Sequence, residues 1–153
     1  MKLYHYTGCG LDNVYLANGY TDHKTPYGRG VSIEDADGLH KEIARGIVLG
    51  SAPIRGQEVR FFRSLMDISQ TGLGKILGVT RPTVARWEGQ PNMAIPAVAD
   101  RLLRLFYAMQ QAGNKIALRV AELLRETDEI EHQTQKHRTV FRETQQGWQR
   151  EAA

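Results

Sequence analysis

Three side chains between residues 81 and 86 could read the bases of DNA: Arg81, Thr83 and Arg86. An arginine guanidinium can donate two hydrogen bonds at once to O6 and N7 of a guanine, which gives about 1 to 3 kcal/mol of discrimination. A threonine methyl group can contact the methyl group of a thymine. We expect Arg86 to make the principal base contact.

A second set of side chains, just before these, could bind DNA phosphates. Hydroxyl, amide and ammonium groups hold phosphate oxygens and orient a protein on the duplex without reading its sequence. Gln70 stands in the first turn of a predicted helix, whose free N–H groups would face the same phosphate. The expected phosphate-binding residues are Ser69, Gln70, Lys75 and Thr80.

Two short helices must position these side chains. Ser69 can cap the first helix, which carries Leu73, Ile76 and Leu77 on one face. Gly78 can end that helix, because glycine takes the left-handed conformation easily. The sequence therefore predicts a helix that ends in a tight turn.

The second helix is predicted from Thr80 as its cap, with Pro82 in the first turn, where the missing N–H costs nothing. Val84 and Trp87 are three residues apart and share a face that we expect to be buried. The candidate base-reading residues then project outward, near the helix end that enters the major groove in a helix-turn-helix.

The stretch from Ser69 to Gly89, SQTGLGKILGVTRPTVARWEG, resembles the Cro/cI (XRE) helix-turn-helix family. The matching positions are Ser69, Gln70, Leu73, Leu77, Gly78, Val79, Thr83, Val84, Arg86, Trp87, Glu88 and Gly89. The resemblance implies a five-helix DNA-binding domain over residues 57 to about 111 that binds operators as a dimer. Gly74 replaces the family's usual alanine; we expect either residue to fit, at a cost to the helix of up to about 1 kcal/mol.

Charge also indicates a polyanionic partner. Residues 55–104 hold eight lysines and arginines against four acidic residues, whereas the whole chain has a net charge of +3. The cations are Arg55, Arg60, Arg63, Lys75, Arg81, Arg86, Arg101 and Arg104. The alternative is that the two helices form an ordinary helical pair whose outward arginines only face solvent.

The first 36 residues are predicted to form strands and turns. Asn18-Gly19, between two strand-like runs, predicts a hairpin. The expected strands are residues 2–6, 12–16, 20–23 and 31–33.

A helix capped by Asp37 should follow, with Leu39, Ile43 and Ile47 on one stripe. Residues 51–56, which include Pro53 and Gly56, are predicted to be a linker.

The helical core is expected to continue with Val59 and Phe62, followed by a long helix that starts near Pro96. That helix should bury Val98, Leu102, Leu103 and Phe106. Beyond Gly113, a further apolar stripe predicts a helix to about Arg125 that could pack on its symmetry mate. The remaining residues are mostly polar, and we leave open a solvated helix, a partner-docking segment or a frayed end.

The order of parts, an N-terminal module followed by a helix-turn-helix, resembles the MqsA/YgiT-type antitoxin repressors. The supporting stretches are YHYTGCGLDNVYLANGY and TPYGRGVSI. This resemblance implies that the N-terminal module holds a toxin and that the helix-turn-helix represses the operon. The zinc site of that family uses two CxxC pairs, whereas this chain has only Cys9.

We expect no metal, no cofactor and no enzymatic activity. His5, Cys9, His23 and His40 match no closed zinc pattern, and a single cysteine excludes an internal disulfide. No carboxylate or histidine has the spacing of a nucleophile, base and orienting group. The start lacks the apolar core of a signal peptide, and no apolar run is long enough to span a bilayer, so we expect a cytoplasmic protein without membrane contact.

These observations predict a mainly α chain: a five-helix domain at 55–112, a small α+β module at 1–54 that binds protein or completes a dimer, and a C-terminal helix and polar tail at 113–153. The expected function is that of a dimeric, sequence-specific DNA-binding regulator of the repressor type, whose expected partners are double-stranded DNA and a toxin protein. The alternative is a toxin-neutralising module in which the helix-turn-helix is only a scaffold.

Overall fold

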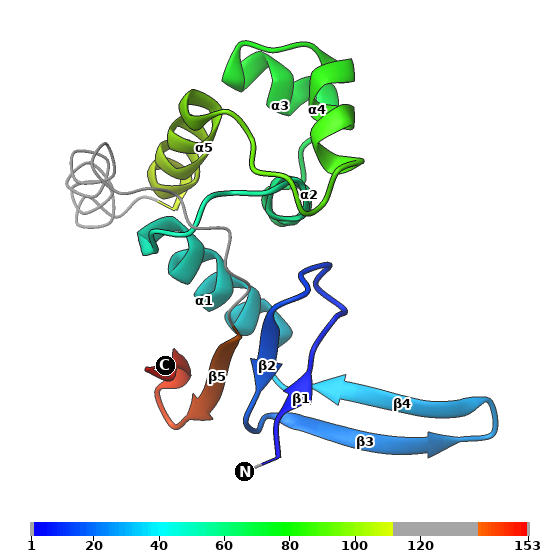
Figure 1. Ribbon diagram of the computed structural model, residues 1–153. Helices are drawn as coiled ribbons and strands as arrows, with labels where there is room; N and C mark the ends of the chain where they lie inside the picture. Colours follow the sequence, from blue (N-terminus) through cyan, green and yellow to red (C-terminus); the bar gives the residue numbers. More distant parts are fainter. Residues whose placement is uncertain (1, 112–137, 153) are drawn as a thin grey trace. The chain divides into compact units, whose positions relative to one another are not determined.

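The computed structural model describes residues 2–111 and 138–152 (Figure 1). The chain divides into two compact units, residues 1–44 with 136–153 and residues 45–135. The predicted helix from about Gly113 to Arg125 lies outside the described residues.

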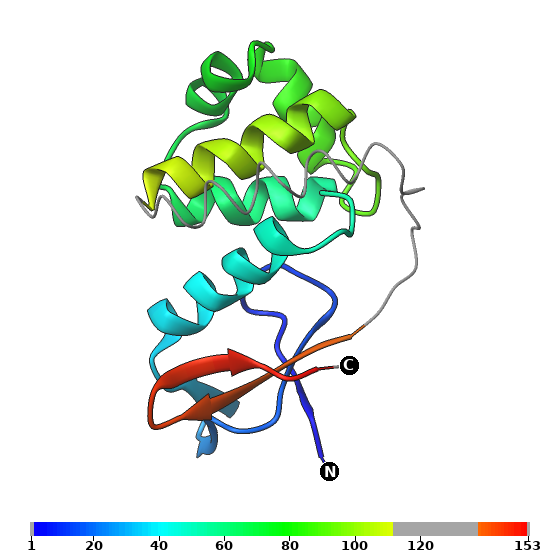
Figure 2. The ribbon, with the colours of Figure 1, turned by 90° about the vertical axis from the view of Figure 1, so that its left-hand side faces the viewer.

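The first unit contains a four-stranded sheet in the order β1-β2-β5-β6. Its strands are β1 (Tyr4–His5), β2 (Val14–Leu16), β5 (Thr139–Thr144) and β6 (Gly147–Arg150). The β2 and β5 strands run parallel, with Leu16 opposite Phe141, and the other neighbours are antiparallel. The tight turn between β5 and β6 is visible in Figure 2. The two ends of the chain therefore build one sheet.

The core of this unit comes from strand residues far apart in the sequence. Val14, Leu16, Phe141 and Trp148 are all buried, and so are Leu39 and Ile43 of helix α1 (Ala36–Leu49). The Trp148 indole N–H donates a hydrogen bond to the Glu34 carbonyl at 3.1 Å. Burial of this indole with its polar atom satisfied ties β6 to the segment before α1.

The expectation of a mainly α chain is wrong. The described residues contain five helices, but 23% of these residues are strand, in two sheets. Residues 139–150, in the polar segment for which the sequence leaves open a solvated helix, a docking segment or a frayed end, form the strands β5 and β6. Strand β5 pairs with β2, more than a hundred residues earlier in the chain, so no local pattern indicated the pairing.

The predicted hairpin at Asn18-Gly19 is also wrong, because β2 does not pair with β3. Gly19 does take a left-handed conformation, with φ of 77°. The Asn18 amide, however, donates to the Glu143 carbonyl at 3.2 Å and accepts from the Glu143 N–H at 2.7 Å. Residues 17–19 therefore connect a strand of one sheet to a strand of the other and do not form the turn of a hairpin.

A separate two-stranded sheet pairs β3 (Tyr20–Thr25) with β4 (Gly28–Ile33). Helix α1 follows it; Leu39 and Ile43 of the predicted stripe are buried and Ile47 is half-buried, while the neighbouring Val48 is buried. The cap of α1 differs from the prediction: the Asp35 carboxylate, not that of Asp37, accepts the N–H of Gly38 at 3.1 Å.

The second unit contains four further helices. They are α2 (Gly56–Leu65), α3 (Gln70–Leu77), α4 (Arg81–Glu88) and α5 (Ala97–Gln110). Val59, Phe62, Leu73, Val84 and Leu103 are fully buried between them. The predicted linker is shorter than expected, because α2 already begins at Gly56.

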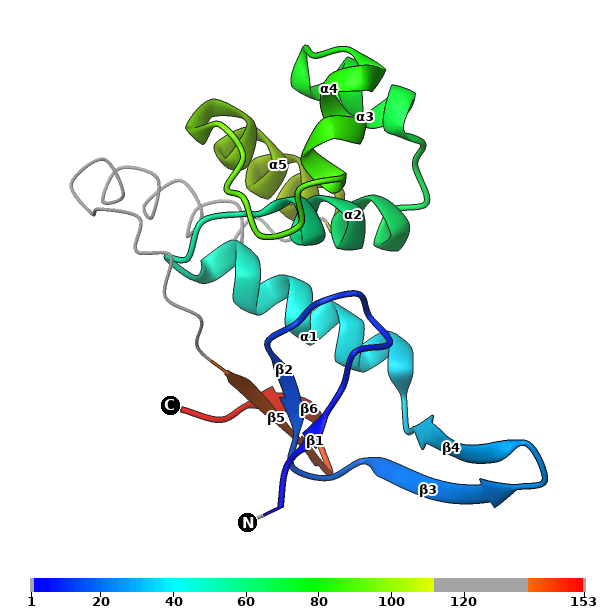
Figure 3. The same ribbon diagram turned by 45° about the vertical axis from the view of Figure 1, so that its right-hand side comes forward.

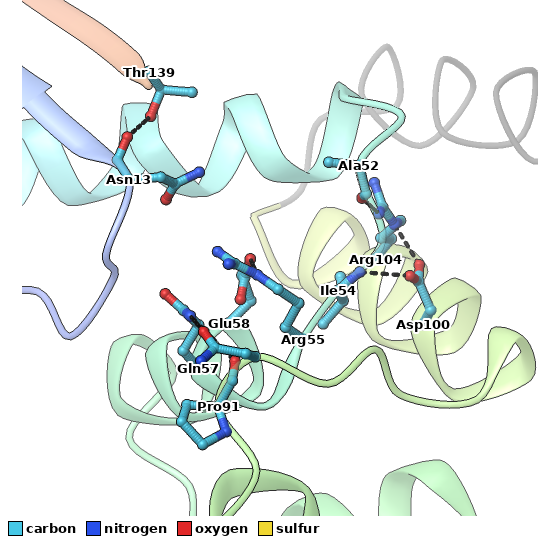
Figure 4. A network of polar contacts seen from close by, with 11 residues as sticks. Asn13, Ala52, Ile54, Arg55, Gln57, Glu58, Pro91, Asp100, Arg104 and Thr139 are labelled. Atoms are coloured by element: carbon cyan, nitrogen blue, oxygen red, sulfur yellow. Dashed lines mark hydrogen bonds and ion pairs between the residues drawn. The ribbon is translucent and has the colours of Figure 1, made fainter. Parts of the chain in front are cut away.

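The predicted buried face of helix α5 is only partly right. Leu103 is buried and Phe106 is half-buried, but Val98 is 69% exposed and Leu102 39% exposed, whereas Asp100 and Arg104 are buried. The Arg104 guanidinium pairs with Asp100 and donates to the carbonyls of residues 47, 50 and 52, while the Asp100 carboxylate accepts the Ile54 N–H at 2.8 Å (Figure 4). Because of this buried ion pair, the charged face of α5, which the sequence pattern assigns to solvent, lies in the interior.

Candidate nucleic-acid interface

Helix α3 is built as its sequence predicts. The Ser69 hydroxyl accepts the N–H of Gly72 at 2.9 Å, which satisfies one free donor of the first turn. Leu73 and Leu77 are buried, and Gly78 ends the helix with φ of 72°. These local contacts confirm the predicted first helix and its turn.

Helix α4 begins after Thr80, with Pro82 in its first turn. The Thr80 hydroxyl does not bind a backbone N–H; it lies 3.1 Å from the hydroxyl of Thr83. Val84 and Trp87 are buried, as predicted. The remaining side chains of this helix therefore define its outer face.

The structure brings the candidate DNA-binding residues onto two consecutive helices and the turn between them (Figures 1 and 3). Arg81 and Arg86 on α4 are exposed, and so is Lys75 on α3. Ser69 and Thr80 are exposed at the two helix starts, whereas Gln70 and Thr83 are half-buried. Three of the five exposed candidate side chains are thus cations.

An ion pair that the sequence did not suggest anchors the end of α4. Arg63 of α2 donates two hydrogen bonds to the Glu88 carboxylate, at 2.8 and 2.9 Å, and a third to the Ile68 carbonyl at 3.3 Å. The hydrogen bonds to Glu88 raise the pKa of Arg63. A carboxylate at a helix C-terminus is unfavourable without a nearby cation. The position of Glu88 at the end of α4 was therefore the one feature of the sequence that could have predicted a cationic partner.

Internal pairing changes the charge argument. Three of the four carboxylates in residues 55–104 neutralise cations that the sequence count assigned to a DNA-facing surface. These pairs join Arg55 to Glu58, Arg63 to Glu88 and Arg104 to Asp100. The exposed cations of the same stretch are Arg60, Lys75, Arg81 and Arg86. Three of these four lie on α3 or α4. Fewer cations are therefore available than the sequence count indicated, but most of those that are available lie on these two helices.

Two glycines allow the helices to approach closely. A Cβ at Gly56 would lie 1.8 Å from the Trp87 carbonyl oxygen, and one at Gly74 would lie 2.6 Å from the Val79 carbonyl oxygen. The expectation that alanine would fit at position 74 is therefore wrong, because the backbone of the turn occupies the space. Both glycines fix where α4 lies.

The candidate metal ligands of the first unit are dispersed. Among the described residues no three His, Cys, Asp or Glu side chains gather in a way that could hold a metal ion. His5 contacts the Asp12 carbonyl at 2.9 Å, and His40 contacts the Tyr6 hydroxyl at 2.9 Å. Burial raises the pKa of the Cys9 thiol.

Comparison with protein families, curated proteins and solved structures finds no match to this chain. Within the described ranges, no helix has the length and apolar character needed to cross a membrane.

Proposed function

We propose that the chain is a sequence-specific DNA-binding transcriptional regulator that acts as a homodimer in the cytoplasm. The observation that carries the proposal is the arrangement of exposed and buried side chains on α4. Arg81 and Arg86 are exposed on a short helix whose Val84 and Trp87 are buried, and this helix follows a tight turn after α3. A helix of this kind presents its outer face to the major groove.

The roles of the exposed side chains follow from their chemistry. Arg86, and with it Arg81, reads guanine edges, because a guanidinium has the donor geometry for O6 and N7. Thr83 has a methyl group for thymine, although its hydroxyl is turned toward Thr80. Phosphates are held by the remaining set, Ser69, Gln70, Lys75 and Thr80.

The resemblance of residues 69–89 to the Cro/cI family supports the same proposal. By the further resemblance to antitoxin repressors, the regulator represses its own operon and the first unit binds a toxin encoded beside it. This unit has the buried core and the exposed ribbon of an independent interaction module.

Enrichment of genomic fragments tests the proposal. Wild type, Arg86→Ala and the control Arg60→Ala are incubated with fragmented host DNA at near-physiological salt, and the retained DNA is sequenced. Arg60 is the matched control, since it is an exposed arginine of the same unit but on α2. A two-fold dimer should select half-sites about one helical turn apart.

We expect wild type and Arg60→Ala to enrich the same palindrome and Arg86→Ala to lose discrimination at one position per half-site, by about 1 to 3 kcal/mol. A Gln70→Ala variant should weaken binding equally on all sequences, because it removes a phosphate contact. No enrichment by wild type would contradict the proposal and favour a protein-binding role for the first unit. Equal losses by Arg86→Ala on specific and random DNA would contradict the assignment of Arg86.

A further inference from the structure

The β3–β4 ribbon is a well-formed hairpin. Six residue pairs align the two strands, from Tyr20 opposite Ile33 to Thr25 opposite Gly28. At the tip, the Thr25 hydroxyl donates to the Gly28 carbonyl at 2.6 Å and accepts the Tyr27 N–H at 3.3 Å. Figures 1 and 3 show the ribbon extending away from β1 and β2 of the same unit. The tip is thus held in one conformation without packing against a core.

Two cations face each other at this tip. Lys24 is directly opposite Arg29, and directly opposed residues of antiparallel strands place their side chains on the same face. Residues 23–30 contain no carboxylate, and in the described part of the chain no carboxylate lies within ion-pair distance of either cation; Asp22 is two residues away along β3. Opposed like charges destabilise a strand pair, so an anion bound between them would relieve a repulsion that the folded chain leaves in place.

The shape and surface of the ribbon suit a nucleic-acid groove. Tyr27 is fully exposed at the turn, where its hydroxyl can donate to a phosphate or sugar oxygen. In the described residues neither edge of the ribbon has a neighbouring strand. The major groove of B-DNA is wide enough for a two-stranded ribbon, and an isolated hairpin gains stability from such a partner.

We propose that the tip of the β3–β4 ribbon is a second DNA contact, in which Lys24 and Arg29 bind phosphates of the duplex and Tyr27 contacts the backbone beside them. The contact adds affinity without sequence preference, because phosphates carry no base information. This inference rests on the proposed function, since it concerns the same ligand, but it uses residues of the other unit.

The salt dependence of binding is the direct test. Lys24→Gln/Arg29→Gln is titrated with two duplexes, the site enriched by wild type and a random sequence of the same length. The slope of log affinity against log salt should fall by about 1.8 for both, because each phosphate contact contributes about 0.9. The ratio of specific to random affinity should stay the same. Tyr27→Ala should weaken binding to both duplexes without changing the slope, because it removes no charge.

A matched control separates the ribbon from net charge. Lys41→Gln/Arg150→Gln removes two exposed cations of the same unit, on α1 and β6, and should leave the slope at the wild-type value. Tyr27→Ala and the control variant should melt at the wild-type temperature, since the substituted side chains are exposed, and Lys24→Gln/Arg29→Gln should melt at or slightly above it, because it removes the repulsion between the two cations.

The outcomes distinguish the two proposals. If wild type binds its site and the Lys24/Arg29 variant keeps the wild-type slope, the ribbon does not touch DNA and the inference fails, while the proposed function stands. An equal loss of slope in the control variant would also overturn it, because the effect would then come from net charge alone. If wild type binds neither duplex, the proposed function fails and the inference fails with it.

Discussion

Replacement of Gly56 by alanine should displace α4, the helix that carries Arg81 and Arg86. Gly56 is the buried first residue of α2, and its N–H donates to the Met93 carbonyl at 3.1 Å. An added Cβ would lie 1.8 Å from the Trp87 carbonyl oxygen and 2.7 Å from that of Gln90. Both obstacles are backbone atoms, one in the last turn of α4 and one just after the helix, so no side-chain rotation can relieve the overlap.

The expected cost can be estimated from two opposing terms. Overpacking costs typically 1 to 3 kcal/mol, and contact with backbone puts this site at about 3 kcal/mol. Alanine is the better helix former by about 1 kcal/mol, which leaves a net loss of about 2 kcal/mol. For a domain of roughly 60 to 100 residues this lowers the melting temperature by about 8 to 16 °C.

Gly89→Ala is the matched control. Gly89 lies at the same end of α4, has φ of −72°, and would place a Cβ 3.4 Å from the nearest carbonyl oxygen, which is ordinary contact. Thermal unfolding followed by far-UV circular dichroism should show a large decrease for Gly56→Ala and little change for Gly89→Ala. Gly56→Ala melting at or above the wild-type temperature would refute the argument that this approach positions α4.

Three further perturbations test the packing. Trp87→Ala should reduce the free energy of unfolding by about 3 to 5 kcal/mol through the cavity it leaves, and an unchanged melting temperature would show that the indole is not a core residue. Arg104→Met should cost about 3 to 5 kcal/mol in urea denaturation, because it leaves Asp100 buried without its cation; a cost below about 1 kcal/mol would contradict this. Burial lowers the pKa of His40 below its usual 6.5, so the unfolded chain binds more protons as the pH falls. The contribution of neutral His40 to the free energy of unfolding should therefore be fully present above about pH 6.5 and be lost as the pH falls toward the folded-state pKa. Urea midpoints that are equal for wild type and His40→Gln at every pH would exclude His40 as the cause.

The helix-turn-helix could be predicted because its determinants are local. The Ser69 cap, the left-handed Gly78 and the buried pair Val84 and Trp87 all act within one or two helical turns. Such contacts depend on residue types at fixed spacing, and the structure confirms each of them. The exposed positions of Arg81 and Arg86 follow from the same periodicity.

The face of α5 could not be predicted in this way. Asp100 and Arg104 have the composition of a solvated stripe, yet they are buried because backbone groups of residues 47–54 supply hydrogen-bond partners. Burial of an ion pair is favourable only where such partners exist, and their presence is a property of the folded chain.

The sequence alone thus determined the two helices, the Ser69 cap of α3 and the exposed positions of Arg81 and Arg86, because each depends on neighbours three or four positions away. Only the tertiary structure decided that residues 139–150 are strands, since their pairing with residues 14–16 depends on chain segments that meet after folding. It also decided which cations remain available to a ligand. Arg63 and Arg104 form ion pairs with Glu88 and Asp100, so they are not available to a ligand. The surroundings that hold these pairs arise only on folding and cannot be predicted from a local pattern.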